Sequence, residues 1–489
     1  MEKLKITEIL RTFSIKEIKE FEKFTKSPFF STGRDVSEIF SIIKKQYPEF
    51  SGKGIKREAI YEKLYPGKPY KDHIMRNNIS VLSKMLAEYL TISRLRKSKV
   101  ESKKMYIDEL LERRLSRPAE LELIKAEKEL RNNNDSGDNY YRKSFEIENQ
   151  KVILNVQVNR QNLIRSSILK QGELLVNNFL EDAGVNYINM LNNAANFNLD
   201  FSSSFLGEFL KNINLENFLK DMKNIREIFE NTELFEIYAC IILTLINKED
   251  TENYYRLKDL LIKNLKRFNR MEKYSLLVTL GTCTSLKAET VSRDIFIREL
   301  FEIYRIRLSS RLYAYSDTQH MSNIFFLSTM KLGISLGEVK WTRDFINDNI
   351  NNLAENQREK MKNYAYAQMS FHEGEFMEAL NYLTRVDFEL YTMKFEVRNL
   401  MAQIYYELDE PEQIIYLSDS YRHFLYKNKT VSKYFKEANL EFIDILNDLV
   451  KYKLSDGAKS ADEISARINS SRTVQKNWFI KKLSELQKK

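Results

Sequence analysis

Residues 367–379, AQMSFHEGEFMEA, and residues 402–414, AQIYYELDEPEQI, share one pattern at an offset of 35 residues. Each stretch begins with Ala-Gln, passes through a short turn rich in acidic residues, and continues with apolar residues at helical spacing. Apolar residues that recur every three or four positions predict helices, and a polar break between them predicts a turn. The two stretches therefore predict two successive helix–turn–helix units.

Helix starts recur at a similar spacing over much of the chain. A second helix is expected in each gap between helix starts near residues 233, 270, 318, 356, 392 and 430, which lie 36 to 48 residues apart. Such a period is typical of a helix-pair solenoid, whose units bury their apolar faces only by stacking on one another. We therefore expect an all-α superhelix over residues 234–451.

The two quoted units resemble tetratricopeptide repeats. Ala367 and Ala402 occupy the small-residue position where paired helices touch, and Ala379 occupies the corresponding position of a second helix. The Gly-Glu-Phe turn at residues 374–376 resembles the Gly-Asp-Tyr turn of the family, and GEVKW at residues 337–341 is a weaker copy. The resemblance covers about residues 318–451 and implies an α-α superhelix that binds proteins or peptides.

The sequence differs from the tetratricopeptide pattern at several positions. Asp409 and Ile414 replace the Gly and Ala of the family in the last copy, and the copy with Gly374 lacks the usual closing proline. The layout of the whole chain, with Ser-Pro-Phe-Phe at residues 27–30, is also similar to uncharacterised bacterial helical proteins. That second resemblance implies no activity.

Composition supports a helical chain. The 489 residues include only 13 Gly and 6 Pro, too few for the turns of a β-rich protein. We expect more than 60% helix and no sheet, arranged as an N-terminal helical domain (1–118), a helical connecting region (119–233), the helix-pair solenoid (234–451) and a C-terminal capping helix (452–489).

Neither a secretory signal nor a membrane span is expected from the sequence. Its longest uncharged apolar run, residues 274–286, is shorter than the roughly 20 residues that cross a bilayer. Cys240 and Cys283 lie in apolar stretches and are expected to be buried, reduced thiols. These features favour a cytoplasmic protein.

Positive charge is concentrated near the N-terminus. The net charge is +9, and residues 51–100 contain 8 Lys and 4 Arg against 4 acidic residues. Residues 57–66 and 75–86 within this block are similar to the last two helices of the winged-helix domain of bacterial transcription activators. The resemblance implies that the second helix enters the major groove of DNA.

On that second helix, helical spacing places His73, Arg76, Asn77, Ser80 and Lys84 opposite the apolar stripe. The remaining candidate contacts with nucleic acid lie nearby: Arg94, Arg96 and Lys97. Residues 91–104 read as basic helix where a wing would need a hairpin. The alternative interpretation is therefore a helical domain with a solvated basic face.

The sequence carries no motif for catalysis, for metal binding or for a cofactor. Its four histidines, His73, His320, His372 and His423, form no metal-binding pair, and no phosphate-cradling glycine loop occurs. Two hypotheses follow. The first is a non-enzymatic scaffold that holds a protein or peptide in a solenoid groove, and the second is a nucleic-acid-associated regulator that contacts phosphate through residues 51–104. The sequence leaves the oligomeric state open.

Overall fold

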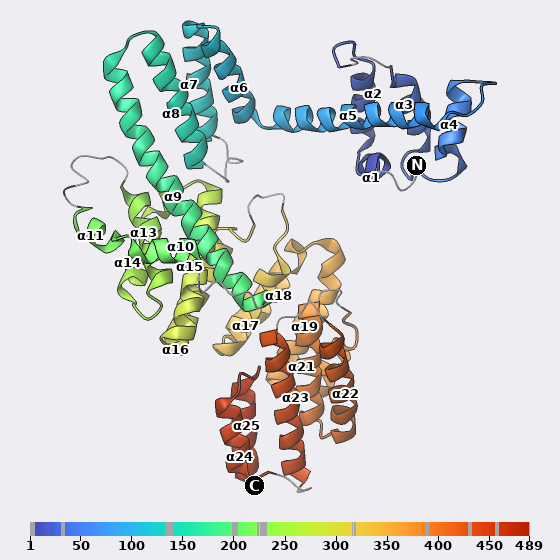
Figure 1. The fold of residues 1–489 in the computed structure, drawn as a ribbon. Coiled ribbons are helices and arrows are strands. Elements are labelled where there is room, and N and C mark those ends of the chain that lie inside the picture. Colours follow the sequence, from blue (N-terminus) through green and yellow to red (C-terminus); the bar gives the residue numbers. More distant parts are fainter. Residues whose placement is uncertain are drawn as a thin grey trace. The chain divides into compact units, whose positions relative to one another are not determined.

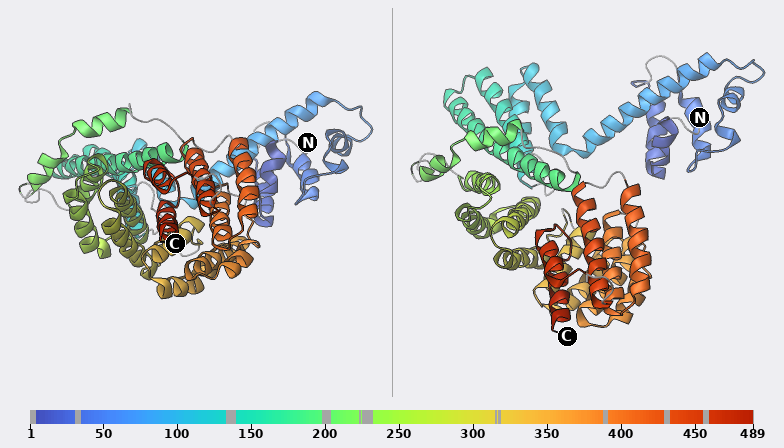
Figure 2. Two further views of the ribbon diagram at one scale, coloured as in Figure 1. Left: turned by 90° about the horizontal axis from the view of Figure 1, so that it is seen from below. Right: turned by 60° about the horizontal axis from the view of Figure 1, so that its bottom comes forward.

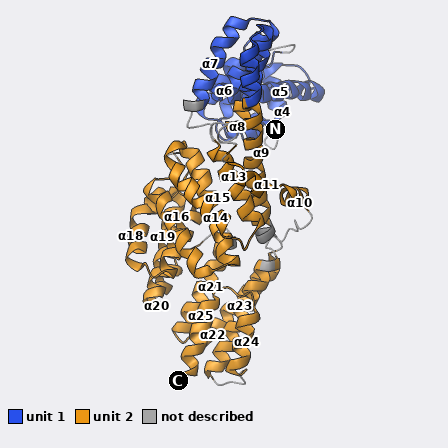
Figure 3. Cartoon of the chain, turned by 90° about the vertical axis from the view of Figure 1, so that its left-hand side faces the viewer, with its two compact units in different colours: residues 1–132, 146–169 blue, residues 133–145, 170–489 orange. Residues whose placement is uncertain are grey.

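The computed structural model describes residues 5–30, 35–132, 140–197, 204–222, 224, 232–314, 316, 319–387, 391–428, 433–454 and 459–488 (Figure 1). Helices contain 82% of these residues, and none of these ranges contains a strand. This result confirms the all-α prediction. Two compact units make up the chain, one of residues 1–132 and 146–169 and the other of residues 133–145 and 170–489 (Figure 3). The domain boundaries expected from the sequence remain predictions.

The first unit begins with a small helical domain around an aromatic core. Ser14 and Glu17 form a capping box at the start of the second helix. The rings of Phe21 and Phe40 lie 4.7 Å apart, and those of Phe21 and Tyr89 lie 5.3 Å apart. The elements of this domain are α1 (Lys5–Arg11), α2 (Ile15–Thr25), α3 (Ser37–Ile43), η1 (Lys44–Gln46), η2 (Lys53–Ile55), α4 (Arg57–Leu64) and α5 (Asp72–Lys97).

The next helices are α6 (Lys99–Glu112), α7 (Ser116–Asn132), α8 (Tyr140–Gln157) and α9 (Gln161–Phe197). Pro118 lies in the first turn of α7, where a proline costs little because its missing N–H has no helical partner. The amide of Gln150 on α8 donates to the backbone oxygen of Lys104 at 2.9 Å, and that of Gln157 donates to Leu111 at 3.0 Å. Polar side chains therefore join α8 to α6.

The second unit is a succession of helix pairs. The pairs are α13 (Glu233–Ile246) with α14 (Glu252–Asn264), α15 (Arg270–Thr290) with α16 (Arg293–Ser309), α17 (Asn323–Ser335) with α18 (Val339–Asn349), α19 (Glu355–Glu373) with α20 (Phe376–Leu383), and α21 (Tyr391–Glu407) with α22 (Pro411–Lys427). The first helices of successive pairs also touch, α13 with α15, α17 with α19 and α19 with α21. This stacking makes the α-α superhelix, whose curved row of helices is visible in Figure 2.

The first residues of the observed helices agree with the helix starts expected from the sequence. The expected starts at 233, 270, 356 and 392 correspond to Glu233, Arg270, Glu355 and Tyr391. Those near 318 and 430 lie outside the described residues, and the described helices there begin at Asn323 and, in α23 (Lys433–Leu454), at Lys433. The remaining elements of this unit are α10 (Phe205–Asn212), α11 (Leu215–Lys220), η3 (Leu265–Arg267) and η4 (Ile350–Asn352).

In three of the pairs, the same type of turn joins the first helix to the second. Gly337, Gly374 and Asp409 have φ angles of 76°, 85° and 61°, and the next backbone N–H donates to the carbonyl five residues before it, at 2.8 to 3.0 Å. This is the hydrogen-bond pattern of a left-handed helix end. Ala367 and Ala379, which flank the Gly374 turn, are fully buried. The aspartate at 409 therefore adopts the backbone conformation that glycine supplies in the two earlier turns.

A buried polar cluster joins three consecutive helices. The Tyr421 hydroxyl on α22 lies 3.1 Å from Oδ1 of Asn399 on α21 and 2.8 Å from Oδ1 of Asn439 on α23. The amide of Asn399 also donates to Oδ1 of Asn439 at 2.9 Å. All three residues are buried, so the cluster fixes the register in which these helices stack.

The C-terminal end differs from the prediction of one capping helix over residues 452–489. The chain there completes α23 and then forms two helices, α24 (Ala461–Ser470) and α25 (Lys476–Gln487). Ser460 and Glu463 form a capping box at the start of α24. Trp478 on α25 donates to the carboxylate of Glu407 at 3.0 Å, and Lys482 pairs with the same carboxylate at 2.8 Å. The prediction of a single helix is wrong because a turn at residues 471–475 separates α24 from α25. This turn lets α25 fold back against α23 and α21.

Candidate functional site

The basic face predicted on α5 exists as an exposed surface. All eight predicted residues are exposed: His73, Arg76, Asn77, Ser80, Lys84, Arg94, Arg96 and Lys97. Helix α5 continues without a break to Lys97, and α6 starts at Lys99, so residues 91–104 form no hairpin wing. The opposite face packs Met75, Leu82 and Leu86 into the domain core. His73, Arg76, Asn77, Ser80 and Lys84 therefore form one side of an amphipathic helix.

Part of this positive charge is neutralised within the domain. The Arg76 guanidinium lies 2.8 Å from the Asp72 carboxylate, which also contacts Arg57 at 3.2 Å and accepts a hydrogen bond from the Tyr70 hydroxyl at 2.8 Å. These donors, Tyr70 first among them, lower the pKa of Asp72. Within the described residues Lys84 makes no ion pair, which leaves its charge for a partner.

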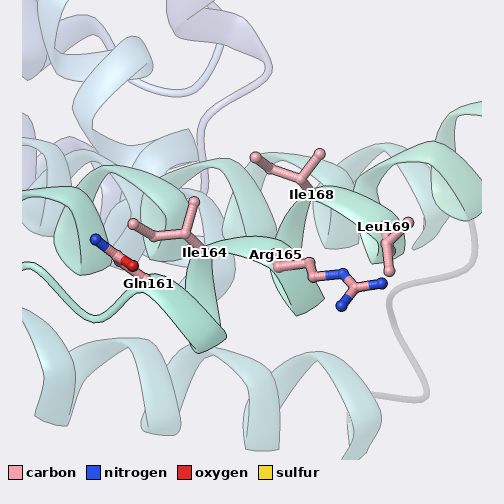
Figure 4. Close-up of a pocket in the computed structure, with 5 residues that line it drawn as sticks. All are labelled: Gln161, Ile164, Arg165, Ile168 and Leu169. Atoms are coloured by element: carbon pink, nitrogen blue, oxygen red, sulfur yellow. The ribbon is translucent and has the colours of Figure 1, made fainter.

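A second surface lies at the start of α9 and is apolar. Gln161, Ile164, Arg165, Ile168 and Leu169 line a groove with a volume of about 370 Å³ (Figure 4). Their spacing of three and four residues places them on one side of the helix. Ile168 and Leu169 expose 52% and 51% of their surface, although leucine and isoleucine are among the residues most often buried.

More exposed apolar residues occur on the neighbouring helices of the first unit. They are Leu121 and Ile124 on α7, and Ile153 and Val156 on α8. Single exposed apolar residues are ordinary on a protein surface, whereas several on adjoining helices are less so. Exposed apolar residues on the helix pairs from α17 to α22 are spread over three helices: Ile324, Met377, Ile415, Tyr416 and Tyr426.

Sequence reasoning missed the face on α9, because it treated residues 119–233 only as a helical connection. The signal was available in the spacing of Ile164, Ile168 and Leu169. Spacing alone, however, predicts a buried stripe as readily as an exposed one, since both have the same period.

Two cysteines and one lysine are buried among the helices of the second unit. Cys240 and Cys283 are buried free thiols, and burial raises the pKa of each to about 12. The ammonium of Lys287 is buried and donates to the backbone oxygens of Asn247 and Lys248 at 2.7 and 2.9 Å, where it caps the end of α13. Burial lowers the pKa of Lys287.

The side chains that could ligate a metal ion are dispersed. Across the part of the chain that the structure describes, no group of three His, Cys, Asp or Glu side chains is arranged to hold a metal ion. The four histidines are exposed and lie on separate segments. None of the helices in the described ranges combines the length and the hydropathy that a bilayer crossing requires.

Comparison of the chain with protein-family models, with curated proteins and with solved structures finds no match.

Proposed function

We propose that this protein is a non-enzymatic scaffold that holds a partner protein or peptide. The observation that carries the proposal is the apolar face of α9, where the exposed Ile168 and Leu169 and the partly exposed Ile164 line an open groove. Apolar surface of this kind is costly to leave in water, and its burial by a partner is favourable by about 25 cal/mol per Å².

The spacing of the α9 face suits an amphipathic helix as the bound segment. Apolar residues on one face of a helix, such as Ile164 and Ile168 four positions apart, can anchor a helix that packs against them. Gln161 and Arg165 supply polar groups at the edge of the face, where they can bond a partner without being buried. The helix pairs of the second unit, including the tetratricopeptide-like stretch at about 318–451, would offer a further surface for peptides. We place the protein in the cytoplasm because both of its cysteines are free thiols.

An affinity-capture comparison tests the scaffold proposal. The full-length chain is used as bait beside Ile168→Glu, which places a charge in the apolar face. The control is Ser166→Glu, which places the same charge on the same helix but outside the groove. We expect one set of partners to be captured by the wild-type and Ser166→Glu proteins but not by Ile168→Glu. Equal capture by all three proteins would contradict the proposal.

The exposed basic face of α5 favours one alternative, a nucleic-acid-associated regulator. Lys84, Arg94 and Arg96 face solvent along one helix, and phosphate contacts from such residues release counterions. The test is fluorescence anisotropy of the full-length chain with duplex DNA over a range of salt concentrations. Binding that weakens steeply with salt would support this function, and no binding at low salt would exclude it.

A further inference from the structure

The N-terminal domain contains a pocket of about 530 Å³ where the turn after α4 meets the start of α5. This volume is within the range of about 300 to 1,000 Å³ that is typical of small-ligand sites. Its wall combines aromatic, apolar, cationic and acidic groups, among them Tyr65, Ile74, Lys68 and Asp35. The pocket is separate from the candidate residues on the exposed face of α5.

One side of the pocket favours an anion. Lys68 and Lys71 line it, and in the described ranges neither ammonium group has an ion-pair partner. Lys71 is also the residue before α5, and no side chain caps this helix start. Within the described residues the backbone N–H groups of Asp72 and His73 have no acceptor, so the positive end of a 26-residue helix lies at the rim.

The wall of the pocket also carries a side-chain amide. Asn78 lines the pocket and is only 6% exposed, yet its side chain has no hydrogen-bond partner among the residues that the structure describes. The amide atoms are accessible from the pocket, so a ligand can take the place of water there. A planar group with both a donor and an acceptor would satisfy the amide, as an adenine does for asparagine in nucleic-acid recognition.

The remaining wall complements such a ring. Tyr65 is half-buried and is supported by the ring of Tyr61 at 4.9 Å, and Ile74 adds apolar surface. Tyrosine rings stack readily on nucleobases. Asp35 accepts hydrogen bonds from the side chain of Ser37 and, at 2.7 Å, from its backbone N–H, and the carboxylate has acceptor capacity left for a ribose hydroxyl.

We propose that this pocket binds a nucleoside phosphate. Lys68 and Lys71 contact the phosphate, Asp35 accepts from the ribose, and Asn78 and Tyr65 recognise the base. Inorganic phosphate would satisfy the lysines but not Asn78 or Tyr65. The same chemistry is carried by a free nucleotide and by the end of a single-stranded nucleic acid.

Isothermal titration of the full-length chain tests the proposal with adenosine, guanosine, cytidine and uridine monophosphates. Inorganic phosphate, adenosine and a short single-stranded oligonucleotide are separate arms. We expect at least one monophosphate to bind about tenfold more tightly than either phosphate or the free nucleoside. A stronger signal with the oligonucleotide than with its monophosphates would identify nucleic acid as the source of the ligand and would still support the site.

Variants distinguish this pocket from other basic surfaces. Lys68→Met with Lys71→Met is expected to weaken monophosphate binding about tenfold, whereas Lys23→Met, which changes an exposed lysine on α2, leaves it unchanged. Asn78→Leu is expected to weaken binding of the monophosphate but not of phosphate. Both lysines are exposed, so their replacement spares folding even if Asn78→Leu does not.

Photolabelling of the wild-type chain with 8-azidoadenosine monophosphate provides a readout that needs no variant. We expect label within residues 61–78, and competition by unlabelled adenosine monophosphate. The proposal is overturned if no nucleoside phosphate binds at millimolar concentration, if phosphate alone binds equally well, or if the label falls outside the N-terminal domain.

Discussion

Replacement of Tyr421 by phenylalanine is expected to loosen the stacking of α21, α22 and α23. The hydroxyl lies within hydrogen-bond distance of Asn399 and Asn439, and it is the only part of the side chain that the substitution removes. Oδ1 of Asn439 still accepts from the amide of Asn399 after the substitution, whereas Oδ1 of Asn399 keeps no donor among the described residues. A buried acceptor without a partner costs about 1–3 kcal/mol.

Hydrogen exchange of backbone amides measures this effect locally. A destabilisation of about 1–3 kcal/mol corresponds to exchange that is about 5- to 150-fold faster at amides of these three helices that open together. Tyr426→Phe is the matched control because it makes the same change on the same helix at a residue that is 70% exposed, where about 0.5 kcal/mol is the largest effect expected. If the amides of these helices exchange no faster in Tyr421→Phe than in Tyr426→Phe, the cluster does not fix the stacking of these helices.

Three further outcomes are expected. Ala367→Leu overfills a fully buried position, so it should destabilise the chain by about 1–3 kcal/mol and lower its melting temperature, and an unchanged melt would contradict the packing described for α19. Hydrogen bonds from Lys44 and then Lys26 lower the pKa of Glu22, so its stabilising effect is present above the ordinary value of 4.5 and is lost as pH falls through the lower folded pKa. Glu22→Gln should therefore flatten the acid side of the thermal-stability profile and Glu38→Gln should not. If the chain binds duplex DNA, Lys84→Ala with Arg94→Ala should reduce the salt slope by about 0.9 for each phosphate that the variant no longer neutralises, and an unchanged slope would remove these residues from the interface.

Much of the superhelix was predictable because its signals are local. The period of the helix starts and the Ala-Gln pairs depend on residues close together in the sequence, and the observed helices follow them. The turn at Asp409 was harder to predict, since aspartate visits the left-handed region less readily than glycine. Its conformation is favoured by the hydrogen bond from Glu410 to the carbonyl of Tyr405.

The candidate surfaces were predictable only in part. The exposure of Lys84 and Arg94 follows from helical spacing on one element, and the structure agrees. The ion pair of Arg76 also joins residues one helical turn apart, but the approach of Arg57 depends on how α4 packs against α5. The pocket around Asn78 depends on tertiary packing in the same way, because its walls come from three separate segments of the chain.

Site-specific cross-linking tests the central claim, that α9 presents a binding face for another protein. A photoreactive amino acid is placed at Ile168, inside the groove, or at Ser166, outside it, in the full-length chain in living cells. The scaffold account predicts a discrete cross-linked protein with the probe at 168 and little or none with the probe at 166. Equal labelling from the two positions, or no partner from position 168, would contradict it.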